Sequence, residues 1–318
     1  MSGTPELIRI GTRAAPMAIF QAGQVAELIR EHAPGIRTEI VTHTTEADKW
    51  QGDLARLGGK GLFTKAVDEK LQRGQIDVAV HCMKDVPGDQ PLPEGLIFGA
   101  YLHREDVHDV VLFPDGSDHK SLGDLPAGAV VASSAVRRKA QILRDRPDLQ
   151  VERVRGLVGS RVERLDKGDR GWSAMVLSMA GLQRLGLGDR AEQILSLEEM
   201  LPAVGAGVIG AECRRDDGPV LGVLQQINDE KTMRELTAER VMLHGLRGHC
   251  NSPIAGRCAT GPDGQLVLRG MVFSREGAHF AHAQFWGEDG NDPAVLGARV
   301  CAELLRQGAR DLIMGIPH

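Results

Sequence analysis

The sequence predicts an α/β fold of two similar units followed by a smaller α+β unit. Short apolar runs alternate with helical periodicity over roughly the first two thirds of the 318 residues, which is typical of a parallel sheet with helices between its strands. The alternation starts again near residue 128, which indicates a second unit. From about residue 230 the pattern changes to a helix, two strands and a helix. At 42% hydrophobic residues, a chain of this length has enough apolar side chains for two or three domains.

The first unit begins with an expected strand, "LIRIGTR", and Pro16 then opens a helix whose apolar residues fall at helical spacing up to Pro34. A second helix ends at Gly74. The strands of this unit are expected at residues 7–13, 38–44 and 76–83, and the second helix at 62–74.

The second unit repeats the order strand, helix, strand, helix, strand. We expect these elements at residues 128–134, 136–146, 149–156, 158–168 and 173–181. In the third unit a helix from about residue 230 leads to the loop around Cys250, and two strands joined by a turn precede a last helix. These are expected at residues 265–274, 278–286 and, for the helix, from about 293 to 310.

Bulk properties narrow the classes of function. A net charge of −5 argues against a nucleic-acid binder that depends on general basicity. The five cysteines have no paired spacing, so we expect reduced thiols, and none of them has the spacing of metal ligands. The N-terminus carries charges where a signal peptide has an apolar run, and no window is as long as a membrane span. We expect a cytoplasmic protein with no metal and no membrane or nucleic-acid partner.

Cations recur just beyond the expected strands, where open α/β sheets bind their ligands. Any single Arg or Lys there is most simply solvated surface, but the set indicates a ligand with several carboxylates or phosphates. Ser133 and Ser134 precede a helix start, where a cap and free N–H groups also favour anions. The candidate cations are Arg13, Lys60, Lys84, Arg137, Arg138, Arg155 and Arg161.

Two further side chains are candidates for chemistry. Asp85 is an acid among these cations, and it is either the ion-pair partner of a neighbour or a group that moves a proton. Cys250 lies in "GLRGHCNSPIAG", where the glycines and Pro253 predict a turn. Gly205, Gly207 and Gly210 match GxGxxG, but without the context of a dinucleotide site, so we interpret them as a close-packed or hinge segment between units.

Six segments resemble the hydroxymethylbilane synthase family, also called porphobilinogen deaminase, in the family's order and over nearly the whole chain. They are "IRIGTRAAPMAIFQA", "GGKGLFTKAVDEKLQRGQIDVAVHCMKDVP", "LHREDVHDVVL", "RRKAQILRDRPDLQVERVRGLVGSRVERLDKG", "LPAVGAGVIGAECRRDD" and "GHCNSPIAG".

The resemblance implies two periplasmic-binding-protein-like domains hinged across a cleft, and a small α+β C-terminal domain that carries a cofactor loop. We expect domain 1 at residues 1–102 and 205–226, domain 2 at 103–204 and domain 3 at 227–318. It also implies the reaction, a stepwise deaminative head-to-tail condensation of porphobilinogen into a linear tetrapyrrole, as in porphyrin and heme biosynthesis. We expect the enzyme to be a monomer.

The resemblance also implies residue roles. Cys250 matches the cysteine that holds a dipyrromethane cofactor through a thioether, and Asp85 matches the catalytic acid that assists proton transfer beside the pyrrole N–H groups. The seven candidate cations match positions that hold the carboxylates of the growing chain. No metal is required.

Four motif positions depart from the family's usual polar residues, namely Ala15, Ala135, Leu157 and Ala206. Two alternatives therefore stay open, a divergent paralogue with an altered product or substrate and a non-catalytic binder of polycarboxylate pyrroles. Trp50 lies in a polar segment that is either a mobile lid over the cleft or an ordinary surface loop.

Overall fold

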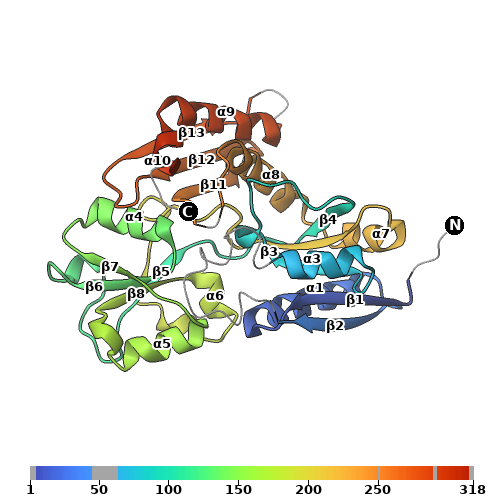
Figure 1. Cartoon of the computed structure of the whole chain (residues 1–318), viewed down its shortest axis with the longest axis horizontal. Helices are drawn as coiled ribbons and strands as arrows, with labels where there is room; N and C mark the ends of the chain where they lie inside the picture. The colour runs from blue at the N-terminus through green and yellow to red at the C-terminus, as the bar shows by residue number, and fades with distance from the viewer. Residues whose placement is uncertain (1–4, 45–63, 250, 289–291, 315–318) are drawn as a thin grey trace.

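The structure, a computed structural model, describes residues 5–44, 64–249, 251–288 and 292–314. Its elements form three lobes (Figure 1), and each lobe contains one sheet. The two expected α/β units and the α+β unit are all present.

The first lobe is built on a five-stranded sheet of order β2-β1-β3-β10-β4. β1 (Leu7–Arg13) pairs in parallel with β2 (Arg37–His43) and β3 (Val78–Cys82). β10 (Ile209–Arg214) runs antiparallel between β3 and β4 (Leu96–Tyr101). The helices of this lobe are α1 (Pro16–His32), α3 (Lys65–Gln72) and α7 (Gly218–Gln226).

The second lobe has a sheet of the same plan, with the order β7-β6-β8-β5-β9. β6 (Val130–Ser133) is parallel to β7 (Gln150–Arg153) and β8 (Ala174–Ser178). β5 (Asp109–Leu112) is antiparallel to β8 and to the short β9 (Gln193–Ile194). Its helices are α4 (Val136–Asp145), α5 (Val158–Asp166) and α6 (Met179–Gln183).

Both sheets are mixed, whereas the sequence pattern predicted parallel ones. The chain leaves the first sheet after β4, enters the second as β5, and returns to the first as β10. Each sheet therefore holds one strand that arrives from the other lobe, and this strand runs against its neighbours. Residues 173–181, expected as one strand, divide into β8 and α6.

The third lobe is a three-stranded antiparallel sheet covered by helices. β12 (Leu266–Phe273) and β13 (Phe280–Trp286) fall where the sequence predicts strands, and β11 (Ile254–Thr260) adds one that the pattern did not predict. α8 (Glu230–Gly245) precedes the sheet. The expected last helix divides at Gly308, whose φ is 87°, into α9 (Pro293–Arg306) and α10 (Ala309–Met314).

Aliphatic side chains fill the cores. Ile8 and Ile10 of β1 are fully buried against Val25 and Ile29 of α1. The second sheet has apolar clusters on both faces, which fits its runs of consecutive apolar residues. Within the described residues, no helix is long and apolar enough to cross a membrane.

Buried charges tie both crossing segments to the third lobe. Arg104, in the segment after β4, pairs with Glu239 of α8 at 3.0 Å and donates to the Ala206 carbonyl at 3.2 Å. The same Glu239 accepts from the Gly205 N–H at 2.8 Å and the Cys258 N–H at 2.9 Å. One carboxylate thus holds three separate segments together.

The glycines of the GxGxxG match lie in the second crossing segment, as a close-packed stretch. Gly207 has a φ of 73°, and a Cβ there would lie 2.5 Å from the Glu105 carbonyl oxygen. A Cβ on Gly210 would lie 2.5 Å from the Met83 sulfur. The expected close packing is confirmed.

Candidate active site

Arg13 and Asp85 line the same cavity, although 72 residues separate them in the sequence. Arg13 is the last residue of β1, and Asp85 lies in the 3-10 turn Met83–Asp85 that follows β3. Because β1 and β3 are parallel neighbours, their carboxyl ends open at the same edge of the sheet. The full lining is Arg13, Ala18, Gln21, Thr64, Val80, His81, Cys82 and Asp85.

Two apolar anchors hold the turn that carries Asp85. Met83 and Val86 are buried in one cluster with Val208 of the second crossing segment, and the Met83 N–H donates to the Val208 carbonyl at 2.9 Å. Lys84 and Asp85, which lie between the anchors, stay partly exposed. Burial of the two apolar ends of "MKDV" therefore keeps the two charged residues between them accessible.

The second sheet brings Arg137 and Arg138 to one carboxylate. Both guanidinium groups are buried in the first turn of α4, and they contact the Asp109 oxygens at 2.7 and 2.8 Å. Burial alone would raise the pKa of Asp109, but the two Arg charges and their hydrogen bonds outweigh it and lower the pKa to about 2. Asp109 therefore neutralises one of the two charges.

Arg161 experiences mainly other cations. It donates to the Gly156 carbonyl at 2.7 Å and to Ser134 Oγ at 3.2 Å. Burial, followed by the charges of Arg138, Arg155 and Arg164, lowers the pKa of Arg161 to about 10. An anion bound beside Arg161 would relieve both effects.

The described polar atoms near these arginines include some that lack partners. Ser133 Oγ and Arg138 Nε are buried and form no hydrogen bond to any other described residue. A buried donor without a partner is costly. The combination of unpaired donors and clustered guanidinium groups fits a ligand with several carboxylates, such as a dipyrromethane bearing acetate and propionate groups.

Three of the four departures from the family pattern are helix N-caps. Ala15, Ala135 and Leu157 precede α1, α4 and α5, and none of these residues forms a side-chain cap. These helices begin beyond β1, β6 and β7, so their first N–H groups lie at the ligand edges of the sheets. The contrast is with helices capped by an aspartate, namely α7 by Asp217, α8 by Asp229 and α9 by Asp292.

Sequence reasoning missed Arg184. It follows α6 with only 6% of its side chain exposed, and it pairs at 2.8 Å with Glu105 of the first crossing segment. Its charge also acts on the thiol of Cys82, which lines the cavity, although burial dominates and raises the pKa of that thiol. Arg184 follows strand β8 by one short helix, and the expectation of a longer strand hid this position.

Cys250, Lys60 and Trp50 lie outside the described residues, whereas Gly248 and Asn251, on either side of Cys250, are described. The Gly88 N–H donates to the Gly248 carbonyl at 3.2 Å, three residues from Asp85 along the first lobe. On the other side, Arg153 Nη2 donates to Asn251 Oδ1 at 3.2 Å, two residues before Arg155 of the second lobe. Gly248 therefore contacts the first lobe and Asn251 the second.

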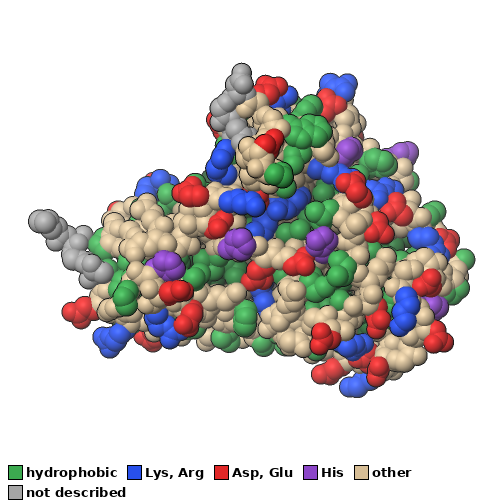
Figure 2. Space-filling view, turned by 180° about the vertical axis from the view of Figure 1, so that it is seen from behind, with side chains coloured by type: hydrophobic (Ala, Val, Ile, Leu, Met, Phe, Trp, Pro, Cys, Tyr) green, Lys and Arg blue, Asp and Glu red, His purple; other side chains and the backbone are tan. Residues whose placement is uncertain are grey.

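The charge distribution agrees with this placement. Figure 2 shows Lys and Arg side chains gathered in the middle of one face, beneath the upper lobe. The chain as a whole is acidic, with a net charge of −5. A group of cations thus lies in the middle of this face, while other Lys and Arg side chains are interspersed with acidic ones over the rest of it.

Two family models match most of the chain. Residues 8–221 match the family described as porphobilinogen deaminase, dipyromethane cofactor binding domain, and residues 233–306 match porphobilinogen deaminase, C-terminal domain. Among solved structures, the methionine binding protein MetQ is 15% identical with a TM-score of 0.43, covering 72% of this chain and 93% of that chain.

Curated relatives match at nearly full length. Porphobilinogen deaminase 2 of Streptomyces coelicolor is 46% identical over 315 residues, which cover 99% of this chain and 98% of the relative. Porphobilinogen deaminase of Acidithiobacillus ferrooxidans is 44% identical, with 97% and 98% covered. That of Brevibacillus brevis is 38% identical, with 96% of each covered. Because two family models match most of the chain and relatives of 38–46% identity match nearly all of it, the chain belongs to the porphobilinogen deaminase family.

Proposed function

We propose that this chain catalyses the deaminative head-to-tail condensation of porphobilinogen into a linear tetrapyrrole, with Asp85 as the catalytic acid. The observation that supports this proposal best is the cavity shared by Arg13 and Asp85 at the carboxyl ends of β1 and β3. An acid that lies beside a guanidinium group can act on a substrate whose carboxylate the guanidinium holds.

The cations bind the acetate and propionate groups of the substrate and of the growing chain. Arg13 and Lys84 act from the first lobe, and Arg155 and Arg161 from the second. Guanidinium groups suit this task because they pair with carboxylates through two parallel hydrogen bonds. The remaining binding residues of the proposal are Lys60, Arg137, Arg138, Ser133 and Ser134.

Cys250 carries the dipyrromethane through a thioether, and this group supplies a covalent primer with a free pyrrole α-carbon. The contacts of Gly248 and Asn251 support this role, because they hold the flanks of the loop against both cation-bearing lobes. A thiol in this position keeps one end of the chain fixed while the other end extends. Arg155 and Arg161 then orient the primer by binding the carboxylates of its pyrroles.

Asp85 moves the protons of each step. Its carboxyl group donates a proton to the amino nitrogen of porphobilinogen, which leaves as ammonia when the C–N bond breaks. A new C–C bond forms at the free pyrrole α-carbon, and the Asp85 carboxylate then accepts the proton that this carbon loses. Asp85 thus returns to its starting state at the end of each cycle, and it stabilises positive charge in between.

The intact mass of the purified protein, with peptide mapping around Cys250, tests the cofactor assignment. We expect an added mass of two deaminated pyrrole units on the Cys250 peptide. Cys250→Ser should remove the addition, and Cys82→Ser should keep it. An unmodified Cys250 after incubation with porphobilinogen would refute the assignment.

Turnover of porphobilinogen tests the role of Asp85. Asp85→Ala should lower kcat by about 10²–10⁴-fold with an unchanged unfolding transition. Asp118→Asn, an exposed acid of the second lobe, is the matched control. Turnover that survives nearly unchanged in Asp85→Ala would contradict the mechanism.

The mass of the product decides whether the chain makes a linear tetrapyrrole or, as a divergent paralogue, another product. Four pyrroles per product would support the tetrapyrrole, and another number would support a divergent paralogue.

The proposal also includes a cytoplasmic monomer. Light scattering during gel filtration should therefore give a mass near 34.3 kDa.

A further inference from the structure

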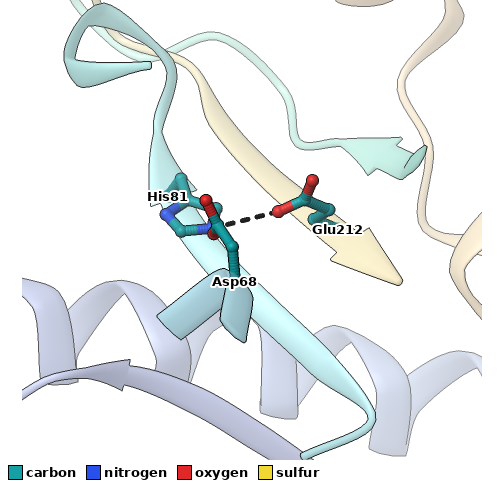
Figure 3. A group of neighbouring side chains, drawn as sticks. All are labelled: Asp68, His81 and Glu212. Atoms are coloured by element: carbon teal, nitrogen blue, oxygen red, sulfur yellow. Dashed lines mark ion pairs between the residues drawn. The ribbon is translucent and has the colours of Figure 1, made fainter. Parts of the chain in front are cut away.

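A buried histidine at the wall of the cavity lies between two carboxylates. His81 Nε2 is 3.1 Å from Asp68 Oδ1 and 3.3 Å from Glu212 Oε2, and all three side chains are buried (Figure 3). The residues come from three different elements, with His81 on β3, Asp68 on α3 and Glu212 on β10. The ion pairs therefore connect β10 to α3 and β3, which are consecutive in the chain and distant from β10 in sequence.

The two carboxylates favour the charged form of this histidine. Burial would lower the pKa of His81, but the hydrogen bonds and charges of Asp68 and Glu212 outweigh it and raise the pKa to about 9. The ring of Phe98 meets the His81 ring edge-on at 6.2 Å, and the titratable residues Arg13, Cys82 and Asp85 line the same cavity as His81. Tyr101 of β4 lies close enough to Glu212 to respond to its charge.

His81 and Asp68 are connected to the strands that carry Arg13 and lead to Asp85. His81 itself lines the cavity and precedes Asp85 by four residues on the same strand and turn. α3, which carries Asp68, packs on β1, β3 and β10, so it spans the strand that ends in Arg13 and the strand that leads to Asp85. Thr64, the N-cap position of α3, lines the same cavity.

We propose that His81 is a positioning residue: its imidazolium ties α3 and β10 to β3 and thereby sets the spacing of Arg13 and Asp85 across the cavity. This inference rests on the proposed function, because the spacing matters when one residue holds the substrate and the other moves its proton. A reacting group that is misplaced by about 1 Å can lose about 10²-fold in rate.

The first test follows the His81 ring by NMR of histidine-labelled protein, with His81→Gln to assign its signal. We expect an imidazolium at pH 7.5 that loses its proton near pH 9, and a lower titration midpoint in Asp68→Asn. A neutral ring at pH 7.5 would overturn the proposal. This measurement does not depend on turnover, so its failure is distinct from a failure of the proposed function in wild-type protein.

The second test compares kinetics at pH 7.5. His81→Gln should lower kcat by about 10-fold or more, while KM for porphobilinogen changes much less, since the binding cations remain. Leu268→Ala, a fully buried residue of the third lobe, supplies a variant of similarly reduced stability. If His81→Gln loses no more kcat than Leu268→Ala, the histidine is only structural and the proposal fails.

Two further measurements close the remaining gaps. If His81→Gln does not fold, Asp68→Asn and Glu212→Gln replace it, and we expect the same loss of kcat.

Asp68, His81 and Glu212 each offer one atom that could bind a metal ion, and these three atoms lie within 4.8 Å of one another. One equivalent of a divalent metal in the dialysed wild-type protein, absent from His81→Gln, would overturn the proposal in favour of a metal-held cluster.

Discussion

At the scale of single residues, Asp109 controls how much positive charge the second lobe presents. It contacts Arg137 and Arg138 at 2.7 and 2.8 Å and is almost fully buried. Replacing it with a neutral isostere leaves two guanidinium groups buried without their anion. Removing one partner of a buried ion pair typically costs about 3–5 kcal/mol.

We therefore predict that Asp109→Asn lowers the free energy of unfolding by about 3–5 kcal/mol, measured by urea denaturation at pH 7. Asp145→Asn, on the helix that carries Arg137 and Arg138, is the control, because Asp145 is exposed and its pair with Arg144 should contribute at most about 1 kcal/mol. Equal effects of the two variants would contradict the importance of burial.

The same residue gives a pH dependence with a definite sign. The pKa of Asp109 is lowered from 3.8 to about 2, because the arginines outweigh the effect of burial. Its contribution to stability is complete above pH 3.8 and is lost as the pH falls toward 2. Asp109→Asn should lack this part of the acid-induced decrease.

The positions of the cations could be predicted from the sequence, but their partners could not. The rule that ligands bind beyond strand ends predicted Arg13 and Asp85, which the structure brings to one cavity. The same rule located Arg137 and Arg138, but Asp109 is 28 residues away from Arg137 and belongs to a strand that the pattern did not predict. Arg184 was missed for a related reason, since an overlong expected strand covered it.

At the scale of elements, the helix starts divide into two groups. α7, α8 and α9 are capped by aspartate side chains, whereas α1, α4 and α5 begin with Ala15, Ala135 and Leu157. A side-chain cap typically contributes about 1 kcal/mol. The helices at the ligand edges lack this contribution, so their first N–H groups remain available to anions.

Introducing a cap should therefore stabilise the protein. We predict that Leu157→Asn raises the free energy of unfolding by about 0.5–1 kcal/mol, because Leu157 is 56% exposed and its replacement loses little packing. Asp229→Ala, which removes the cap bonded to the Thr232 N–H at 2.7 Å, should lower it by about 1 kcal/mol. No gain from Leu157→Asn would mean that the α5 start is already satisfied in another way.

Element type could be predicted from the sequence better than strand direction. Hydrophobic runs predicted β1, β3, β6 and β8 near their observed positions, because buried strands are apolar along their length. The antiparallel β5 and β10 depend on where the chain crosses between lobes. This long-range property leaves no local period, and β5 has only four residues.

At the scale of the whole molecule, Glu239 connects the three lobes. It accepts from Gly205 of the second crossing segment and Cys258 of the third lobe, and it pairs with Arg104 of the first crossing segment. The side chain is fully buried. A change there should therefore affect the junction around which the first two lobes are joined.

We predict that Glu239→Gln lowers the free energy of unfolding by about 3–5 kcal/mol, because the amide keeps the shape but leaves the Arg104 charge poorly matched. Thermal and urea unfolding measure this loss. Increased cleavage by a protease at residues 102–108 or 195–208 would show that the junction has loosened.

The control for this variant is an exposed ion pair between the second crossing segment and the third lobe. Glu198 pairs with Arg269 at 2.6 Å, but the Glu198 side chain is 81% exposed. Glu198→Gln should therefore change stability by at most about 1 kcal/mol and leave the protease pattern unchanged. This pair, like the hydrogen bond from Gly205 to Glu239, connects the second crossing segment to the third lobe, but it lies at the surface. If Glu198→Gln proved as damaging as Glu239→Gln, the lobes would be held by surface charges rather than by the buried carboxylate.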